Sequence, residues 1–406
     1  MVLNSSWLTL AMLFAALLVA SGSQSAYGVL LPTLEAEFGV SRVASSTVML
    51  LYLIALGFWN VIAGWFTDRF TSKWAINLGY AALVIGLAVW SLSTHIFHLY
   101  LIHGAIISFG TAFLGLTVLS PIISKKFITQ SGLALGFVSI GFPLGQLTMP
   151  PILAILVTIL DWRTALICSS LAIGVLGLFT SVTIRGGGAG CKESDAEVRK
   201  QTFGDPRLKK AVYIASIPYF VCGFTDFLIM THLIAYATSL NIGLTWAALS
   251  ISLIGAFNIP ALILLGLFAD RFGAGASLTL TYSIRFCSFL ILLNADTLLT
   301  LYLFAAIFGL TSYTTAPLAA KLVFVGYGSR RASTVYGLLV LVHMIGGAIG
   351  ALCGGVIFDA YDSYKLAFLF STLLLAVAVL LSFYAQKVSS SQPIGGLEFG
   401  IDNRER

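Results

Sequence analysis

The chain contains few charged side chains. Only 9% of its 406 residues are Asp, Glu, Lys or Arg, and 58% are hydrophobic, whereas a soluble domain carries about 25% charged residues. This composition excludes an ordinary water-soluble domain. Apolar runs of about 20 residues recur from end to end, and each is long enough to cross a hydrocarbon core of about 30 Å as a helix.

The apolar runs also lack the alternation of polar and apolar residues that transmembrane β-strands need. Lipid offers no hydrogen-bond partner to a backbone N–H or C=O, so continuous apolar segments cross it as helices. We therefore predict an all-α membrane protein that lies in a lipid bilayer. The first apolar run has no basic segment before it, so we expect it to be a helix of the protein rather than a signal peptide.

Cysteine is scarce, and the five cysteines are widely separated. Four of them lie inside apolar runs, and no pair has the spacing of metal ligands. We therefore expect small buried hydrophobic side chains, no bound metal and no cofactor. The five are Cys168, Cys191, Cys222, Cys287 and Cys353.

Catalytic motifs are absent as well. The sequence has no Ser-His-Asp set within one loop, no cluster of metal ligands and no Walker-type phosphate loop. We therefore predict that the protein is not an enzyme and that ATP does not drive it. The net charge of +6 comes from basic residues scattered over short connectors, so nucleic acid is not an expected partner.

The apolar runs define twelve candidate spans. They lie at roughly 7–32, 43–66, 73–93, 97–120, 132–158, 162–184, 210–238, 243–268, 276–295, 298–325, 333–358 and 362–386. A Gly-rich, charged segment divides them into six and six. We predict one six-helix bundle over 1–184, a cytoplasmic linker over 185–209, a second bundle over 210–390 and a cytoplasmic tail over 391–406.

Basic residues in the connectors predict the orientation, because cytoplasmic loops carry an excess of Lys and Arg. With both termini in the cytoplasm, 18 basic residues lie on the inner side, and only Arg42, Arg163 and Lys365 lie on the outer side. We therefore expect a multi-pass protein of the cell (inner or plasma) membrane, with both termini cytoplasmic.

The two halves repeat each other. "GWFTDRF" at 64–70 returns as "GLFADRF" at 266–272, an offset of 202, and "DWRTALI" at 161–167 is echoed by "SYKLAFL" at 363–369. An even number of spans, a basic linker and matched halves indicate a transporter built from two related bundles.

"GWFTDRFTSK" resembles the loop signature between helices 2 and 3 of the major facilitator superfamily. The resemblance implies the major facilitator fold, alternating access and a monomer. It also implies a gating latch that holds the two halves together in the outward-open state, in which the glycines allow close helix approach and the charges make the contacts. The implied latch residues are Gly64, Asp68 and Arg69, with Gly266, Asp270 and Arg271 as the second copy.

Three longer strings are similar to the branch that holds monocarboxylate transporters and oxalate/formate antiporters. They are "YGVLLPTLEAEFGVSR", "GLALGFVSIGFPLGQLTMPPI" and "CGFTDFLIMTHLIAYATSLNIG". The resemblance implies a small organic anion as substrate. Two departures concern the residues that would bind the anion. The eighth span lacks the arginine usual in that branch. The eleventh span has His343 but no lysine, whereas oxalate/formate members carry a lysine there.

Two charges lie deep in predicted spans, Asp226 in the seventh and Arg285 in the ninth. An unpaired charge inside a bilayer costs several kcal/mol, about 2.5–3.5 by insertion scales, so we expect the two to pair. Two interpretations remain open. Asp226 is a proton-binding carboxylate that couples transport to a proton gradient, or the pair is a fixed tie between two helices.

Two histidines are candidates for substrate binding. His232 is six residues from Asp226, which places it on a different face of the helix; it lines an outer cavity or packs near the interface. His343 lies at mid-depth, where it lines the cavity wall or is a core histidine bonded to a carbonyl.

Uncharged polar side chains complete the candidate substrate site. Gln24 and Tyr27 share one face of the first helix, Asn258 is the amide of the eighth span, and Tyr313 lies in the tenth. Each is able to hydrogen-bond a carboxylate. For Gln24, Tyr27 and Tyr313, helix–helix bonding is the alternative.

The sequence thus predicts a secondary active transporter for a monocarboxylate-like anion, coupled to protons. The alternative is a drug or metabolite exporter of the same superfamily, working as an antiporter. Labelled lactate or pyruvate uptake driven by an inward proton gradient favours the first, and efflux of lipophilic cations without such uptake favours the second.

Overall fold

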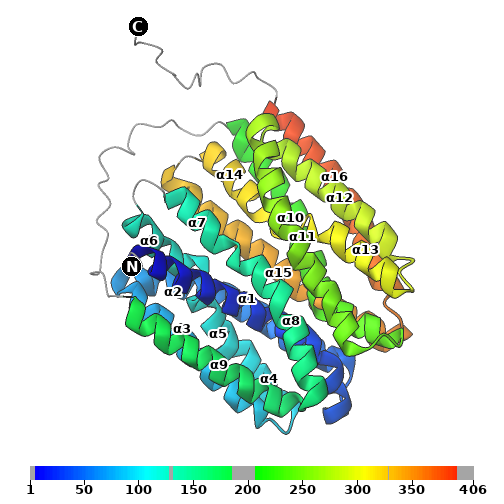
Figure 1. The fold of residues 1–406 in the computed structure, drawn as a ribbon. Coiled ribbons are helices and arrows are strands. Elements are labelled where there is room, and N and C mark those ends of the chain that lie inside the picture. The colour runs from blue at the N-terminus through cyan, green and yellow to red at the C-terminus, as the bar shows by residue number, and fades with distance from the viewer. Residues whose placement is uncertain (1–4, 128–130, 185–205, 328, 391–406) are drawn as a thin grey trace.

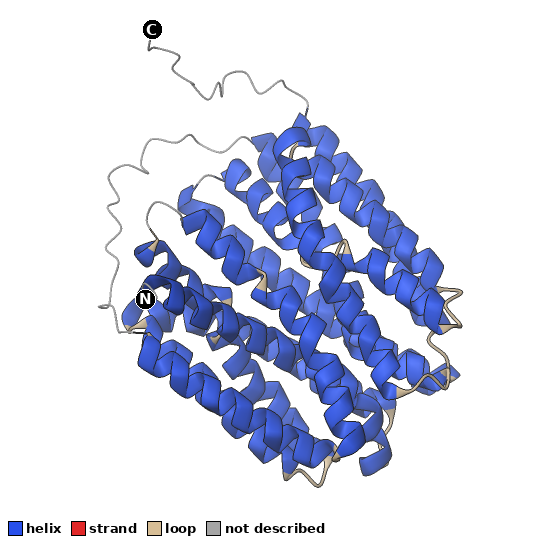
Figure 2. Cartoon of the chain, viewed as in Figure 1, coloured by secondary structure: helices blue, strands red, loops and turns tan. Residues whose placement is uncertain are grey.

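The computed structural model describes residues 5–127, 131–184, 206–327 and 329–390. Every described secondary-structure element is helical, as Figure 2 shows. The apolar composition explains this, because helices satisfy all their own backbone groups within a bilayer. The predicted all-α membrane fold is confirmed.

The first half contains ten helical segments within the described ranges. They are α1 (Ser5–Phe38), α2 (Arg42–Arg69), α3 (Ser72–Ser91), α4 (Ile96–Leu101), the π-helix η1 (Ile102–Ile107), α5 (Ser108–Phe113), α6 (Leu116–Lys126), α7 (Ser131–Ser139), α8 (Gly141–Ile159) and α9 (Trp162–Thr183). The predicted spans at 97–120 and 132–158 are therefore interrupted rather than continuous.

The second half contains seven helices within the described ranges. They are α10 (Pro206–Ser239), α11 (Leu244–Phe272), α12 (Ala274–Leu292), α13 (Leu298–Gly309), α14 (Thr315–Tyr327), α15 (Ser329–Tyr361) and α16 (Lys365–Ser390). The helix α10 begins inside the predicted 185–209 linker. The rest of that linker and the 391–406 tail lie outside the described residues.

Eleven helical stretches of the described chain are long and apolar enough to cross a membrane. The remaining predicted span, the tenth (298–325), is also present but is divided into α13 and α14. The prediction of one continuous helix there was wrong. Short turns over Leu310–Thr314 replace the helix, and Tyr313 has φ of 52°, a left-handed conformation that does not continue an α-helix.

Successive spans alternate in direction, so the connections gather at two ends of the molecule. We call them the Glu35 end, where α1 ends near Glu35, and the linker end, where α9 ends and α10 begins. The Glu35 end carries the α1–α2, α3–α4, α8–α9, α10–α11, α12–α13 and α15–α16 connections. The linker end carries the α2–α3, α6–α7 and α11–α12 connections. In Figure 1, α1 begins and α16 ends at the linker end.

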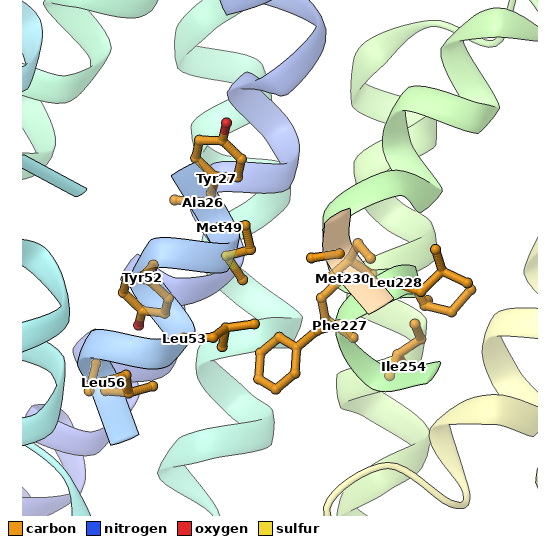
Figure 3. Packing of buried hydrophobic residues seen from close by; sticks show 14 of the residues in the cluster. Ala26, Tyr27, Met49, Tyr52, Leu53, Leu56, Phe227, Leu228, Met230 and Ile254 are labelled. Carbon is orange, nitrogen blue, oxygen red and sulfur yellow. The ribbon is translucent and has the colours of Figure 1, made fainter. Parts of the chain in front are cut away.

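The two halves lie side by side, and α1, α2 and α8 of the first half pack on α10, α15 and α11 of the second. Figure 3 shows buried side chains from both halves, among them Met49 and Leu53 of α2 and Phe227 and Met230 of α10. Most buried hydrophobic side chains form one continuous core across both halves.

Within the second half, α10 and α15 approach until their backbones touch. A Cβ added at Gly346 would overlap the carbonyl oxygen of Phe220, and one added at Gly350 would overlap that of Phe224. These glycines lie four residues apart on one face of α15, a spacing that allows close helix contact in membranes.

A buried ion pair at a broken helix

Asp226 of α10 and Arg285 of α12 form an ion pair. Asp226 Oδ1 lies 3.1 Å from Arg285 Nη2, and the side chains are 14% and 0% exposed, respectively. The expected pairing is confirmed. Because the guanidinium is fully buried and the carboxylate is partly open, Asp226 is the accessible member of the pair.

The remaining donors of Arg285 bind neutral acceptors on α10 and at the broken helix. Nε donates to Thr311 Oγ1 at 3.1 Å and Nη2 to the Thr311 carbonyl at 2.8 Å. Nη1 lies 3.0 Å from Cys222 Sγ and 3.3 Å from Thr225 Oγ1. Arginine offers five N–H donors, so this dense set of acceptors holds the guanidinium at one depth.

The turns over Leu310–Thr314 supply the Thr311 carbonyl and hydroxyl that meet Arg285. Broken helices at mid-membrane expose backbone groups that must find partners. Asn258 of α11 provides one such partner, since its Nδ2 donates to the Gly309 carbonyl at 3.2 Å and also to the Ser312 carbonyl. Asn258, predicted to bind substrate, is buried and holds this break in place.

Tyr313 projects from the break toward the first half. Gln146 Nε2 of α8 donates to its hydroxyl at 3.3 Å, and its ring centroid lies 4.1 Å from that of Phe142. Tyr313 is half-buried and joins the two halves, and the hydroxyl of the neighbouring Ser312 donates to Asp226 Oδ1 at 3.4 Å. Gln146 was not among the predicted site residues.

Cys222, Asp226 and His343 bring their ligand atoms within 4.8 Å of one another. Such a trio is able to bind a transition metal in other surroundings. Here the Arg285 guanidinium contacts both Cys222 Sγ and Asp226 Oδ1, and its positive charge opposes a metal cation. The trio therefore supports an anion site around Arg285 better than a metal site.

His343 of α15 makes the carbonyl contact of a core histidine, and its lining of a substrate cavity stays a prediction. Its Nδ1 lies 3.2 Å from the Tyr219 carbonyl, as expected of a core histidine, and its side chain remains half-buried beside Asp226. His343 and Asp226 thus belong to one cluster, which the sequence did not predict.

His232 packs in the core rather than lining a cavity. Its Nε2 lies 2.7 Å from the Ala351 carbonyl and its Nδ1 lies 3.0 Å from the Tyr364 hydroxyl. The side chain is fully buried. Of the two predicted alternatives, the structure favours packing near the Glu35 end.

Gln24 and Tyr27 are both buried in the first half. The Tyr27 hydroxyl donates to the Ser45 carbonyl of α2 at 2.5 Å, so this side chain bonds two helices together. Gln24 precedes Asp226 by 202 residues, the offset of the internal repeat, and is its counterpart in the first half.

His103, which was not among the candidate site residues, lies at the centre of an aromatic cluster. Its ring centroid is 4.7 Å from that of Tyr52 and 4.9 Å from those of Tyr27 and Trp90. It belongs to the π-helix η1. The surrounding rings make His103 part of the first-half core.

The predicted gating loops lie at the linker end. Arg69 is exposed, with its guanidinium 5.9 Å from the Trp65 ring; the Asp68 side chain lies outside the described structure. Asp270 pairs with Lys321 of α14 at 2.6 Å, within its own half, and Arg271 lies 5.3 Å from the Phe272 ring.

The two gating glycines do not bring helices into close contact in this structure. A Cβ at Gly266 would have no neighbour within 4 Å, and one at Gly64 would make an ordinary contact of 3.4 Å with Thr117. The close approach implied for these glycines is thus not present in this conformation, and the latch of the outward-open state stays a prediction.

At the opposite end, four side chains form what we term the Glu35 clasp: Glu35, Arg42, Asp359 and Tyr364. Arg42 Nε lies 2.6 Å and 2.8 Å from the Glu35 carboxylate oxygens, and Arg42 Nη1 donates to the Tyr364 hydroxyl. Asp359 of α15 accepts from the backbone N–H groups of Arg42 and Val43 at 2.9 and 2.8 Å.

Asp359 therefore caps the N-terminus of a helix from the other half. Carboxylates are stabilising at this position because helix N-termini expose free N–H groups and partial positive charge. The clasp joins the two halves at the Glu35 end. Asp359 was missed from the sequence, because its partner is backbone and leaves no pattern in the residue types.

Two six-span halves, a broken span and a buried ion pair near the middle of the second half define a multi-pass membrane carrier. The chain belongs to the Major Facilitator Superfamily, whose family model matches residues 13–351 and 215–398. The recognition made from the gating motif is confirmed.

Two relatives are similar along most of the chain. The uncharacterized MFS-type transporter YcxA of Bacillus subtilis (strain 168) is 24% identical over 352 residues, covering 83% of this chain and 84% of its own. The oxalate:formate antiporter of Oxalobacter formigenes is 20% identical over 287 residues, covering 70% of this chain and 68% of its own.

Solved structures support the same fold. A bacterial homologue of the human lysosomal transporter Spinster, inward-facing and unoccupied, aligns with a TM-score of 0.76 at 13% identity, covering 96% of this chain and 98% of its own. A variant of the nucleoside transporter NupG also reaches 0.76 at 13% identity, with coverages of 94% and 100%. The major facilitator fold is thereby confirmed.

Proposed function

We propose that the protein is a proton-coupled secondary active transporter that moves a small monocarboxylate-like anion by alternating access. It works as a monomer in the cell membrane, with both termini cytoplasmic and the Glu35 end outside. The observation that carries the proposal is the Asp226–Arg285 pair, in which a fully buried guanidinium is covered by a partly open carboxylate.

The charge of the pair explains the coupling. With Asp226 ionised, the empty site is neutral. When Asp226 takes a proton, Arg285 is left with an unbalanced charge, and a substrate carboxylate restores neutrality in place of Asp226. Burying an unpaired charge is costly. The site therefore changes conformation more readily when it is empty, or when it holds both the proton and the substrate, than when it holds only one of them.

The Glu35 clasp fits one step of this cycle. It closes the outer end while the gating loops at the linker end carry no cross-half contact among the described side chains. Substrate and proton would exchange with the cytoplasm in this conformation. Breaking the clasp and closing the linker end would then turn the site outward.

The first test is uptake of labelled lactate or pyruvate into proteoliposomes under an inward proton gradient. Asp226→Asn keeps the size of the side chain and removes its proton exchange. We expect it to abolish gradient-driven accumulation while exchange of labelled for unlabelled substrate continues. Glu37→Gln, which removes one carboxylate of an exposed pair with Arg163, is the matched control and should behave as the wild type.

A second variant separates coupling from a purely structural tie. Asp226→Asn/Arg285→Gln removes both charges, so a structural pair should be relieved of its uncompensated charge. We expect the double variant to fold but not to bind or exchange the anion. Recovery of full coupled transport by the double variant would contradict the proposal, and so would efflux of lipophilic cations without any monocarboxylate uptake.

A further inference from the structure

Arg42 of the Glu35 clasp is shared between the two halves of the molecule. Within its own half it pairs with Glu35 near the end of α1, with Nε 2.6 Å from one carboxylate oxygen. Across the junction, its Nη1 donates to the Tyr364 hydroxyl, and its guanidinium carbon lies 4.2 Å from the centre of the Phe358 ring of α15. A change in the charge of Glu35 therefore alters the balance between these two sets of contacts.

The clasp carries an excess negative charge when both of its carboxyl groups are ionised. Glu35 and Asp359 are two acids, whereas Arg42 is the single base among the four side chains of the clasp. The Glu35 and Arg42 side chains are only 13% and 11% exposed. Because an unbalanced charge is less stable when it is removed from water, the closed clasp favours the uptake of a proton more than the open one does.

Glu35 is the carboxylate better placed to accept that proton. Asp359 is exposed and accepts hydrogen bonds from two backbone N–H groups at the start of α2, and both features favour its ionised form. Glu35 Oε1 is buried and, apart from its ion-pair contact with Arg42, has no hydrogen-bond partner among the described residues. The fully buried Ser45 hydroxyl lies beside this carboxylate and equally lacks a partner in the described part of the chain, so it is available to a protonated Glu35.

Four further titratable side chains surround the clasp. Tyr27 of α1 bonds the Ser45 carbonyl, Tyr100 of α4 bonds the Ala44 carbonyl, and Tyr364 bonds Arg42. Free phenols titrate near about pH 10, far above carboxylates. The fourth is His232 of α10, which is fully buried with Nδ1 3.0 Å from the Tyr364 hydroxyl. His232 is therefore the group whose titration has to be distinguished from that of Glu35.

We propose that Glu35 is a proton-binding site through which acid on the outer side holds the clasp closed. Protonation removes the excess charge and ends the ion pair of Arg42 within its own half, while its contacts with Tyr364 and Phe358 reach the second half. When the clasp opens, Glu35 returns the proton to the side from which it came. The site thus regulates the outer end and adds nothing to the protons carried with the substrate. It goes beyond the proposed function, from which it takes only the orientation of the Glu35 end.

A cysteine placed under the clasp measures its opening. Ser46 is fully buried, with its hydroxyl bonded to the Arg42 carbonyl, so we follow maleimide labelling of Ser46→Cys in lipid nanodiscs, where both faces share one pH. Each rate is divided by that of Asp362→Cys, an exposed position at the same end, because thiol reactivity itself depends on pH. The corrected rate should fall about three- to tenfold from neutral pH to mild acid, as a roughly tenfold difference in proton affinity between open and closed clasp allows.

Three substitutions in the Ser46→Cys protein test the assignment to Glu35. Glu35→Gln imitates the protonated side chain, so it should label slowly at neutral pH, match the unsubstituted clasp in acid and lose the pH response. Asp359→Asn keeps an oxygen that accepts from the start of α2 but removes the second negative charge, so it should weaken the response. Glu37→Gln, in the exposed pair with Arg163, is the matched control and should keep the full response.

Two results would overturn the proposal. Glu35→Gln labelling faster than the unsubstituted clasp at every pH would make Glu35 only a structural partner of Arg42. A pH response that survives in Glu35→Gln, and disappears in His232→Gln or Asp226→Asn, would assign it to another group. If Glu35→Gln does not fold, equal responses in Asp359→Asn and Glu37→Gln are the contradicting result. Labelling needs no substrate, so failure of monocarboxylate uptake would sink the proposed function and leave this site standing.

Discussion

Asp161 has φ of 145°, in a region that glycine occupies far more readily than other residues. The side chain compensates by capping α9: its carboxylate accepts from the backbone N–H groups of Arg163 at 2.7 Å and Thr164 at 3.0 Å. The hydrogen bond from Thr164 is the main reason why the pKa of Asp161 lies below its ordinary value. A strained residue is thus retained for its cap.

We predict that Asp161→Ala lowers the melting temperature in detergent by about 2–4 °C, and that Asp161→Gly lowers it less. Alanine loses the cap and keeps the strain, whereas glycine loses the cap and relieves the strain. Thermal unfolding of both variants beside the wild type measures the order. A glycine variant less stable than the alanine variant would contradict the backbone argument.

The same cap carries a pH dependence. Because the folded pKa of Asp161 is lowered, its stabilisation is present above the ordinary aspartate pKa, near about 4, and is lost as the pH falls through the lowered folded value. The melting-temperature gap between wild type and Asp161→Ala should therefore be widest near neutral pH and shrink in acid. A gap that grows on acidification would refute this account.

Single residues also show where sequence reasoning ends. Asp226 and Arg285 were predictable as partners, because they are the two unambiguous charges deep in the spans and each needs the other. Cys222 and Thr311 were not predictable as partners of Arg285, because neutral polar residues are common in the spans and the choice depends on packing. His343 joined the cluster only through the close approach of α10 and α15.

At the scale of elements, the division of the tenth span into α13 and α14 is the feature that builds the site. An unbroken helix would have satisfied its own carbonyl groups and left none for Arg285. The break was not predicted, because hydropathy is the same for a broken and a continuous apolar segment. The nearby Gly309 and Pro317 were the available signal, since both residues weaken a helix.

Asn258 holds the break, and its replacement tests how much the break matters. We predict that Asn258→Leu, similar in size but without donors, destabilises the protein by about 1–3 kcal/mol, because two buried carbonyl groups lose a partner. Thermal unfolding gives the stability, and labelled pyruvate uptake should fall with it.

Asn60→Leu is the control for this experiment. The Asn60 side chain donates to the Leu56 carbonyl at 2.8 Å. Both residues lie within the unbroken helix α2, so the Leu56 carbonyl does not depend on the Asn60 side chain for a hydrogen-bond partner. Its loss should cost clearly less than the loss of Asn258. Equal costs for the two variants would mean that the break does not depend on Asn258.

At the scale of the whole molecule, the Glu35 clasp is expected to set the balance between conformations. We predict that Asp359→Ala speeds the reaction of a Ser46→Cys variant with a membrane-impermeant maleimide by about five- to thirtyfold, since losing the cap shifts the balance by about 1–2 kcal/mol. Ser46 is fully buried under the clasp, so labelling reports its opening.

Asp362→Ala is the matched control, because Asp362 is an exposed carboxylate three residues further along the same end of the chain. It should leave the labelling rate of the Ser46→Cys variant unchanged. Equal acceleration by both substitutions would show that charge near this end matters and the cap does not. The wild-type protein, which keeps Ser46, is labelled in parallel to subtract the reaction of the native cysteines.

The overall architecture was largely predictable, and the reasons are physical. Apolar runs of membrane length and the internal repeat of 202 residues define twelve spans in two halves. The cysteines were less predictable: Cys222 is buried as expected, but Cys287 is exposed on α12, since a membrane-facing surface accepts an apolar thiol as readily as a core does. The hydropathy of a residue is therefore no guide to whether it faces the membrane or the protein core.

The contact between Gly346 and Gly350 of α15 and the carbonyl groups of α10 has a consequence for motion. Two helices whose main chains are in contact are not free to slide or hinge against each other, so α10 and α15 should move as one rigid body. Nitroxide labels on this pair should keep a constant separation through the whole cycle. The conformational change of the transport cycle would then bend the chain mainly at the breaks between α7 and α8 and between α13 and α14.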